Sequence, residues 1–189
     1  EILIGLVGSE MCIRDSIHAP VSGTVTAVDL QPNGQGVRQM MITIKREGDE
    51  WVPEVDLTPD LVRECTLEPK EILDRIKAAG IVGMGGATFP THVKLSVPPG
   101  KKAEFLIING VECEPYLTSD HRTMLEKGEE LMVGTTILMR ALGVKQAQIG
   151  IENNKPDAIA FLRELSKHYE GVRVTPLKVR YPQGGEKQL

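Results

Sequence analysis

Short apolar runs alternate with longer amphipathic stretches over the C-terminal part of the chain. The runs are too short for helices and rich in Ile and Val, which is typical of strands buried in a parallel sheet. The stretches between them repeat apolar residues at helical spacing and stop near Gly143 and Gly171. The apolar runs occupy residues 104–109, 147–151 and 172–179. This β-α-β-α-β order predicts the α/β class, as a three-layer, Rossmann-like domain with a mostly parallel sheet.

A further helix is predicted just before this pattern. Thr66 is a suitable N-cap, and Pro69 fits the first helical turn. Ile72 and Ile76 fall on one face of that helix. Gly80 is expected to end it, because glycine readily adopts the left-handed conformation common at helix ends. We place the α/β domain at residues 66–189, with its helical start at this point.

The N-terminal part has a different pattern. β-branched residues crowd the segment 21–28, Pro32-Asn33-Gly34 marks a turn, and a second apolar run covers residues 40–44, so a β-hairpin is predicted. Residues 17–50 resemble part of the all-β barrel-sandwich hybrid of biotinyl and lipoyl carriers. Those carriers hold their cofactor on an exposed lysine, and residues 17–44 contain none. We therefore expect a structural or docking module here, followed by a polar linker over residues 51–65.

Residues 1–16 stand apart from both patterns. The segment 7–16, VGSEMCIRDS, reads as the translation of a common sequencing adapter, so we expect residues 1–16 to be an artefact. The other end of the chain falls inside a loop that carries a candidate site. We expect the domain to be truncated there, because natural domains rarely end within a functional loop.

Composition narrows the functional classes. The chain has 189 residues, 41% of them hydrophobic and 25% charged, which is ordinary for a globular protein. Its net charge of −4 gives no reason to expect nucleic acid binding. No apolar run is long enough to cross a bilayer. Because Cys12, Cys65 and Cys113 form no CxxC pair, no metal site is expected in this chain.

The chemically most informative stretch covers residues 80–95, with the sequence GIVGMGGATFPTHVKL. It places four glycines within seven residues and a lysine shortly after them. Glycine lets a ligand approach the backbone, and successive exposed N–H groups form a concave site for an anion such as phosphate. The stretch completes neither a Walker loop nor a dinucleotide fingerprint. By itself it therefore favours a glycine-rich surface turn.

Two later segments change this interpretation. They are residues 109–116, NGVECEPY, and residues 181–189, YPQGGEKQL. Together with the glycine stretch, and in the same order, they resemble flavin-binding motifs of two related proteins. These are the NADH-binding subunit of respiratory complex I and the C subunit of the Rnf ion-translocating ferredoxin:NAD oxidoreductase. The resemblance covers residues 17–189 and implies a domain that binds FMN and NAD(H).

The resemblance also implies which residues contact the cofactor. It assigns no catalytic side chain, because the flavin itself carries the redox chemistry and the protein positions it. If residues 109–116 are extended, Glu112 and Glu114 face the same side, where two carboxylates near one flavin would tune its potential or accept hydroxyl groups of the nicotinamide ribose. The implied cofactor-binding residues are Gly83, Gly85, Gly86, Lys94, Asn109, Glu112, Glu114 and Glu186.

Departures from the complex I pattern leave two alternatives open. Arginine, glycine, an acidic residue and glutamate are usual there, where this chain has Met84, Thr88, Val111 and Gly185. One alternative is a cobalamin reductase of the propanediol-utilisation type, which has a similar flavin loop. The other is a non-catalytic docking subunit that kept the fold and lost the flavin. The N-terminal module and the segment 150–156, GIENNKP, favour the Rnf type.

The resemblance therefore implies an electron-transfer subunit, an NADH-dependent flavin oxidoreductase of the translocase class that is inactive as an isolated fragment. Electrons would pass to 4Fe-4S clusters encoded beyond Leu189. The implied partners are other subunits of a membrane electron transport complex and, indirectly, a ferredoxin-type carrier, with no nucleic acid. The implied location is peripheral, on the cytoplasmic side of the bacterial inner membrane.

Overall fold

The computed structural model describes residues 19–53, 55–84, 88–185 and 187–189. The chain divides into two compact units, with the boundary between Asp60 and Leu61. Each unit has its own secondary structure.

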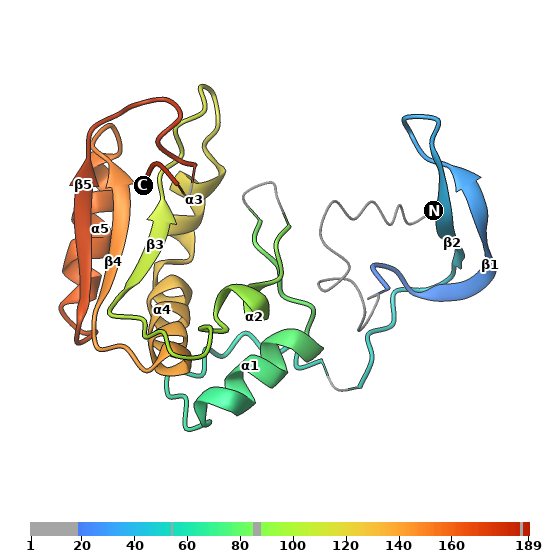
Figure 1. Cartoon of the computed structure of the whole chain (residues 1–189), viewed down its shortest axis with the longest axis horizontal. Helices are drawn as coiled ribbons and strands as arrows, with labels where there is room; N and C mark the ends of the chain where they lie inside the picture. The colour runs from blue at the N-terminus through green and yellow to red at the C-terminus, as the bar shows by residue number, and fades with distance from the viewer. Residues whose placement is uncertain (1–18, 54, 85–87, 186) are drawn as a thin grey trace. The chain divides into compact units, whose positions relative to one another are not determined.

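The first unit contains the predicted hairpin. Strand β1, Gly23–Pro32, pairs antiparallel with β2, Arg38–Arg46, and the register shifts at a bulge between Val25 and Ala27 (Figure 1). Asn33 shapes the connecting turn, because its side-chain oxygen accepts the N–H groups of Gln35 and Val37.

The second unit is built on a parallel sheet. Strands β3, Leu106–Gly110, β4, Ala147–Glu152, and β5, Val172–Leu177, lie in the order β3-β4-β5. Both pairings are parallel, with Ile149 opposite Ile108 on one side and Val174 on the other. The expected α/β class with a parallel sheet is confirmed.

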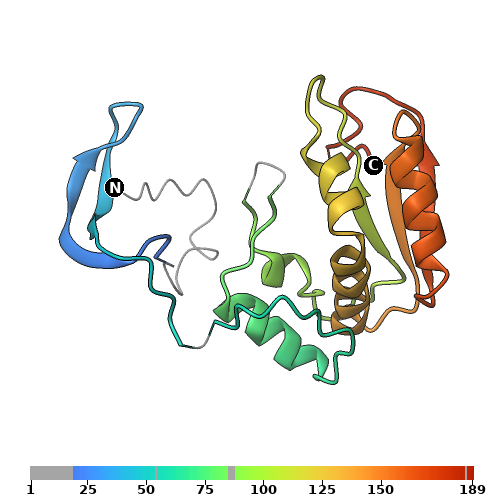
Figure 2. The ribbon, with the colours of Figure 1, turned by 180° about the vertical axis from the view of Figure 1, so that it is seen from behind.

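Helices cover one face of this sheet. They are α3, Ser119–Glu126, α4, Gly128–Leu142, and α5, Pro156–Ser166, and all three lie on the same side in Figure 2. Strand residues that point to this side pack with helix residues into one hydrophobic core. The fully buried members of this core include Met132, Ala147, Ile149, Ile151 and Leu162.

The opposite face of the sheet is open over the described residues. Phe105 and Ile107 are about half exposed there, and a shallow hollow of about 270 Å³ lies over the strands. Its lining comprises Phe105, Ile107, Gln148, Gly150, Thr175, Leu177 and Leu189. The described part of the chain thus shows two layers rather than the expected three, because no described helix packs on this apolar face.

A second cluster holds the segment that precedes the sheet. Helix α1, Pro69–Ala78, buries Ile72 and Ile76 against Ala141 of α4 and Leu95, which follows the short helix α2, Thr91–Lys94. Helix α4 therefore contributes to both clusters. It is the common support of the sheet and of the segment that carries the glycine stretch.

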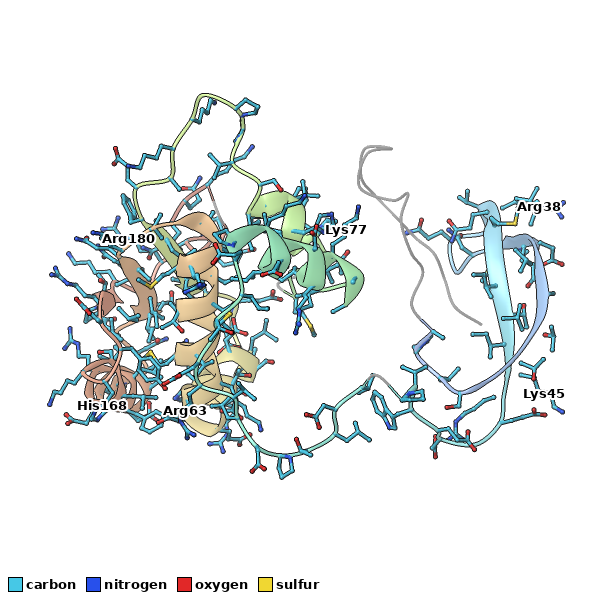
Figure 3. The ribbon with its side chains drawn as sticks, turned by 90° about the horizontal axis from the view of Figure 1, so that it is seen from below. Arg38, Lys45, Arg63, Lys77, His168 and Arg180 are labelled. Carbon is cyan, nitrogen blue, oxygen red and sulfur yellow. The ribbon has the colours of Figure 1, made fainter. Side chains whose placement is uncertain are left out.

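Polar contacts fasten the chain before α1 to the same support. The guanidinium of Arg140 donates to the backbone oxygens of Thr66 and Leu67. Arg63, labelled in Figure 3, forms an ion pair with Glu129 of α4 at 3.7 Å. Residues 61–65 therefore belong to the second unit, although they lie in the segment expected to be linker.

Helix boundaries correct two sequence expectations. Helix α1 has Glu68 as its N-cap rather than Thr66, because the carboxylate of Glu71 accepts the N–H of Glu68 at 2.9 Å. Asn153 and Asn154 are of a residue type that often caps helices, so the sequence favours one of them as the N-cap of α5, but Lys155 occupies that position. Asn153 is still engaged by the sheet there, since its N–H donates to Leu177 of β5 at 2.8 Å.

Candidate functional site

Three loops follow the carboxyl ends of the three parallel strands and lie along one edge of the sheet. They are residues 111–118 after β3, 153–155 after β4 and 178–189 after β5. Figure 1 shows the last of these crossing from β5 towards the end of β3. This edge is where ligands bind in open parallel sheets. It collects two of the three motifs singled out in the sequence.

Direct hydrogen bonds join those two motifs. The side-chain amide of Asn109 donates to the backbone oxygen of Gly184 at 2.8 Å, and its oxygen accepts the N–H of Val111 at 3.1 Å. The N–H of Gly184 donates in turn to the Sγ of Cys113 at 3.2 Å. Asn109 thus fixes the loop after β3 and the C-terminal segment to each other.

The contact at Gly184 leaves no room for a side chain. A Cβ on Gly184 would lie 2.8 Å from the oxygen of Val111 and 2.9 Å from the Sγ of Cys113. Glycine is therefore required here by the close approach of two backbones. Cys113 acts as the small packing residue and weak acceptor of this junction.

Glu112 and Glu114 do not share one side, which corrects the expectation for an extended loop. Glu114 is exposed, whereas Glu112 is only 8% exposed. The Glu112 carboxylate accepts the N–H groups of Asp120 and His121 at 2.8 and 3.3 Å. The chain turns after Pro115, and this turn lets Glu112 bind the first turn of α3, where a carboxylate is stabilised.

The structure adds two charged residues that sequence reasoning did not select. Lys155 and Glu152 are 5% and 1% exposed, and their charged groups lie 3.5 Å apart. The Lys155 ammonium is 4.0 Å from the Glu112 carboxylate and 3.4 Å from the Glu112 backbone oxygen. The available signal was the position of both residues within the segment GIENNKP, at the carboxyl end of a buried strand.

The glycine stretch forms a loop closed by its own backbone. Val82 and Pro90 form an isolated antiparallel bridge, and the N–H of Gly83 donates to the oxygen of Phe89 at 2.9 Å. Among the described residues, the oxygen of Phe89 is the only atom within 4 Å of the position that a Cβ on Gly83 would take, at 3.7 Å. The packing of the described residues therefore does not require glycine at position 83.

The other predicted contact residues lie in α2 or outside the described part of the chain. Lys94 ends α2, is exposed, and has its ammonium 5.9 Å from the centre of the Phe89 ring. Gly85, Gly86 and Glu186 lie outside the described residues. The structure therefore joins Asn109 to Gly184, directs the Glu112 carboxylate to α3, and places Lys94 at the end of α2, next to the cluster formed with α1 and α4.

Backbone strain falls in two of the three motifs. Among the described residues, the non-glycine positions with positive φ are Thr88, at 48°, and Tyr116, at 70°. Such conformations cost about 1–3 kcal/mol each and cluster at functional sites. Thr88 stands where the complex I pattern has glycine, so the strain has a direct explanation in sequence: a β-branched residue occupies a glycine position.

Relief of this strain can be measured. Thr88→Gly is expected to raise the free energy of unfolding by about 1 kcal/mol, the strain relieved less the extra entropy of glycine in the unfolded chain. Thr91→Gly is the matched control, because Thr91 begins a helix and glycine there costs roughly 0.5–1 kcal/mol. Urea titration measures both changes. A stability loss in both variants would contradict the strain argument.

Two carboxyl groups beside the site are shifted in opposite directions. Desolvation first, and repulsion by Glu112 second, raise the pKa of Asp120 above its ordinary value, and Lys155 opposes this only in part. The hydrogen bond from His121, at 2.9 Å, lowers the pKa of Asp157, and the N–H of Ala158 adds to this effect. Acid strength therefore differs between two aspartates at the starts of α3 and α5.

The opposite directions of these two pKa shifts predict that the two aspartates affect stability with opposite pH dependences. A raised pKa means that the fold favours protonated Asp120, so Asp120→Asn is expected to stabilise the protein at neutral pH. This gain disappears as the pH falls below the ordinary aspartate pKa, about 4. A lowered pKa means that the fold favours ionised Asp157, so Asp157→Asn is expected to destabilise the protein at neutral pH. This loss of stability fades as the pH falls through the lowered pKa of the folded state. Urea midpoints from about pH 3 to pH 8 test this; parallel curves for the two variants would contradict it.

Two kinds of feature are absent from the described residues. No helix among them has the length and apolar character needed to span a bilayer. No group of three or more His, Cys, Asp and Glu side chains is arranged there to hold a metal ion.

Comparison with a family model gives a match over residues 76–189. The model describes the Nuo51 FMN-binding domain. The matched region contains the glycine loop, the Asn109 junction and the C-terminal segment, and it extends over more than half of the chain.

Curated relatives resemble the chain over nearly its whole length. It is 45% identical to the C subunit of a proton-translocating ferredoxin:NAD(+) oxidoreductase complex from Clostridium ljungdahlii, with 96% of this chain and 39% of the relative covered. It is 44% identical to the C subunit of a Na(+)-translocating ferredoxin:NAD(+) oxidoreductase complex from Acetobacterium woodii, with 92% and 39% covered. It is 46% identical to the C subunit of an ion-translocating oxidoreductase complex from Rhodobacter capsulatus, with 92% and 34% covered.

The chain therefore spans between a third and two fifths of the length of these relatives. Among solved structures, it resembles an NAD+-reducing NiFe-hydrogenase in the air-oxidized state. The TM-score is 0.54 at 25% identity, with 63% of this chain and 22% of that chain covered.

Proposed function

Because the chain belongs to the Nuo51 FMN-binding domain family, we propose that its second unit binds FMN and serves electron transfer in an ion-translocating ferredoxin:NAD oxidoreductase complex. The curated relatives carry names of subunits of such complexes. Two relatives that are almost equally identical to this chain have names that specify different ions. The proposal therefore includes translocation by the complex without specifying the ion.

The junction of Asn109 with Gly184 is the observation that carries this proposal. It unites two motifs at the carboxyl edge of a parallel sheet, the edge at which this architecture binds nucleotides. The exposed side chains near it fit a flat aromatic ligand. Tyr116 and Tyr181 are largely exposed on the two joined motifs, and aromatic rings stack well on such a ligand.

The glycine loop supplies the other requirement, a place for the phosphate of FMN. Gly83, Gly85 and Gly86 would allow close backbone approach, and Lys94 would add a positive charge to the same loop. Glu114 and Glu186 would remain available for hydroxyl groups of FMN or NAD(H). Glu112 would act from behind the loop, since its carboxylate is already bound to α3. When bound, FMN exchanges a hydride with NAD(H) and passes on single electrons.

The wider arrangement is part of the proposal. Electrons would leave through 4Fe-4S clusters in a segment beyond this chain, towards a ferredoxin-type carrier. The protein would attach through partner subunits at the cytoplasmic side of the bacterial inner membrane. The N-terminal unit, residues 17–50, would be the non-carrier barrel-sandwich module, since β1 and β2 form its hairpin without a lysine at the turn.

FMN titration of the native full-length protein tests the binding step. Lys94→Met is expected to weaken FMN binding roughly 10- to 150-fold, because a charged hydrogen bond contributes about 1.5–3 kcal/mol. Lys101→Met, at an exposed lysine in a turn outside the motifs, should leave affinity unchanged. Absence of FMN binding in the unmodified protein would overturn the proposal and favour the docking role. Reduction of cobalamin in place of ferredoxin would favour the cobalamin reductase.

A further inference from the structure

A buried cluster of three charged residues lies behind the loop after β3. Glu112, Glu152 and Lys155 are 8%, 1% and 5% exposed. They contribute two negative charges and one positive charge. Glu152 ends β4, Lys155 precedes α5, and Glu112 follows Val111, whose N–H donates to the side chain of Asn109. The cluster therefore holds an excess of one negative charge next to the candidate flavin site.

The position of Lys155 is unfavourable by itself. A buried ammonium loses its hydration, and the N-terminus of α5 is the positive end of that helix. Lys155 is compensated by the two carboxylates, by the Glu112 backbone oxygen and by the side-chain oxygen of Asn154 at 3.5 Å. The buried ammonium of Lys155 is thus stabilised by the other members of the cluster.

Glu152 is the least satisfied member. Neither of its carboxylate oxygens has a hydrogen-bond partner among the described atoms, and its ion pair with Lys155 spans 3.5 Å. Glu112, by contrast, accepts two backbone N–H groups besides facing Lys155. Lys155 is 3.5 Å from Glu152 and 4.0 Å from Glu112, and it can balance only one of the two carboxylates. One negative charge is left over, and among the described residues Glu152 is the carboxylate with no stabilising contact besides Lys155. A surplus buried charge costs stability, and this cost calls for a reason in function.

We propose that this cluster tunes the redox potential of the flavin, with Glu152 making the bound FMN harder to reduce. The inference rests on the proposed FMN site and specifies how that site is regulated electrostatically. Reduction adds electron density to the flavin ring, and a buried negative charge nearby opposes this addition. The interaction is only weakly screened, because the cluster is shielded from solvent.

The geometry favours Glu152 over other acids as the source of this effect. Glu112 is stabilised by two backbone N–H groups in the first turn of α3, and Glu114 is exposed and screened by water. Lys155 connects Glu152 to the loop directly, through its contact with the Glu112 backbone oxygen. The charge of the cluster therefore acts on the loop that would face the ring.

Two substitutions that change the charge in opposite directions test the proposal in the native full-length protein loaded with FMN. Glu152→Gln removes the surplus negative charge at nearly constant shape, and the flavin potential is expected to shift in the positive direction. Asn154→Asp adds a negative charge beside Lys155, and the potential is expected to shift in the negative direction, by less because position 154 is exposed. Glu164→Gln, at an exposed site on α5, is the control and should not change it.

Spectroelectrochemical titration gives the potentials, and FMN fluorescence titration gives the affinities. We expect all four proteins to bind FMN within a few-fold of each other. Equal potentials, or shifts of the same sign in Glu152→Gln and Asn154→Asp, would overturn the proposal, because a purely structural disturbance has no charge-dependent sign. Loss of FMN from Glu152→Gln would assign Glu152 a structural role instead. Absence of FMN from the unmodified protein would overturn the proposed function itself, together with this inference.

Discussion

Lys155→Met is expected to lower the free energy of unfolding of the second unit by about 3–5 kcal/mol, because it leaves two buried carboxylates without a counter-charge. Glu112 and Glu152 are almost fully buried, and Lys155 is their shared cation. Methionine fills nearly the same space, so the loss reports charge rather than volume. Chemical denaturation followed by circular dichroism measures it.

Two comparisons isolate the cause. Glu152→Gln should change stability by less than about 1 kcal/mol, because Lys155 still faces Glu112 after the surplus charge is removed. Lys167→Met removes another lysine at the opposite end of α5. Its ion pair with Glu164 is largely exposed, and such pairs contribute about 0–1 kcal/mol. Similar losses for Lys155→Met and Lys167→Met would contradict the shared-cation role.

Gly184→Ala is the second substitution with a large expected effect, and it acts on the proposed cofactor site. The new Cβ would lie 2.8 Å from the Val111 oxygen and 2.9 Å from the Cys113 Sγ. Backbone atoms must then move apart, and overpacking of this kind costs about 1–3 kcal/mol. If FMN binding needs the two motifs joined, the same energy weakens binding roughly 5- to 150-fold. FMN titration and urea denaturation together measure both effects.

Gly134→Ala is the matched control. Gly134 lies within α4, and among the described residues no atom outside the neighbouring helix backbone lies within 4 Å of the position its Cβ would take. Alanine there is expected to stabilise the helix by about 0.5–1 kcal/mol and to leave FMN affinity unchanged. Unaltered FMN binding by Gly184→Ala would show that the junction between the motifs is not needed for the cofactor.

Helices and strands were predictable from the sequence wherever buried residues recur at a regular spacing. Helix α4 ends where the sequence indicates, with Gly143 in the left-handed conformation just after it. The strands β3, β4 and β5 match the three apolar runs within a few residues. Helix α3 was not predicted, because it is short and buries mainly Met124. Its position depends on Glu112, which binds its first turn across a gap of eight residues.

The sequence by itself determined the α/β class, the order of the strands along the chain and the motifs by which the family is recognised. These properties depend on local periodicity and on residue types at fixed spacing. The tertiary structure decided which distant groups meet. Asn109 contacts Gly184 across 75 residues, and Glu112 faces Lys155 across 43. Such contacts follow from the register of parallel strands and from the turns after them, which no local pattern specifies. For that reason, the buried charge of Glu152 and Lys155 became visible only in the folded chain.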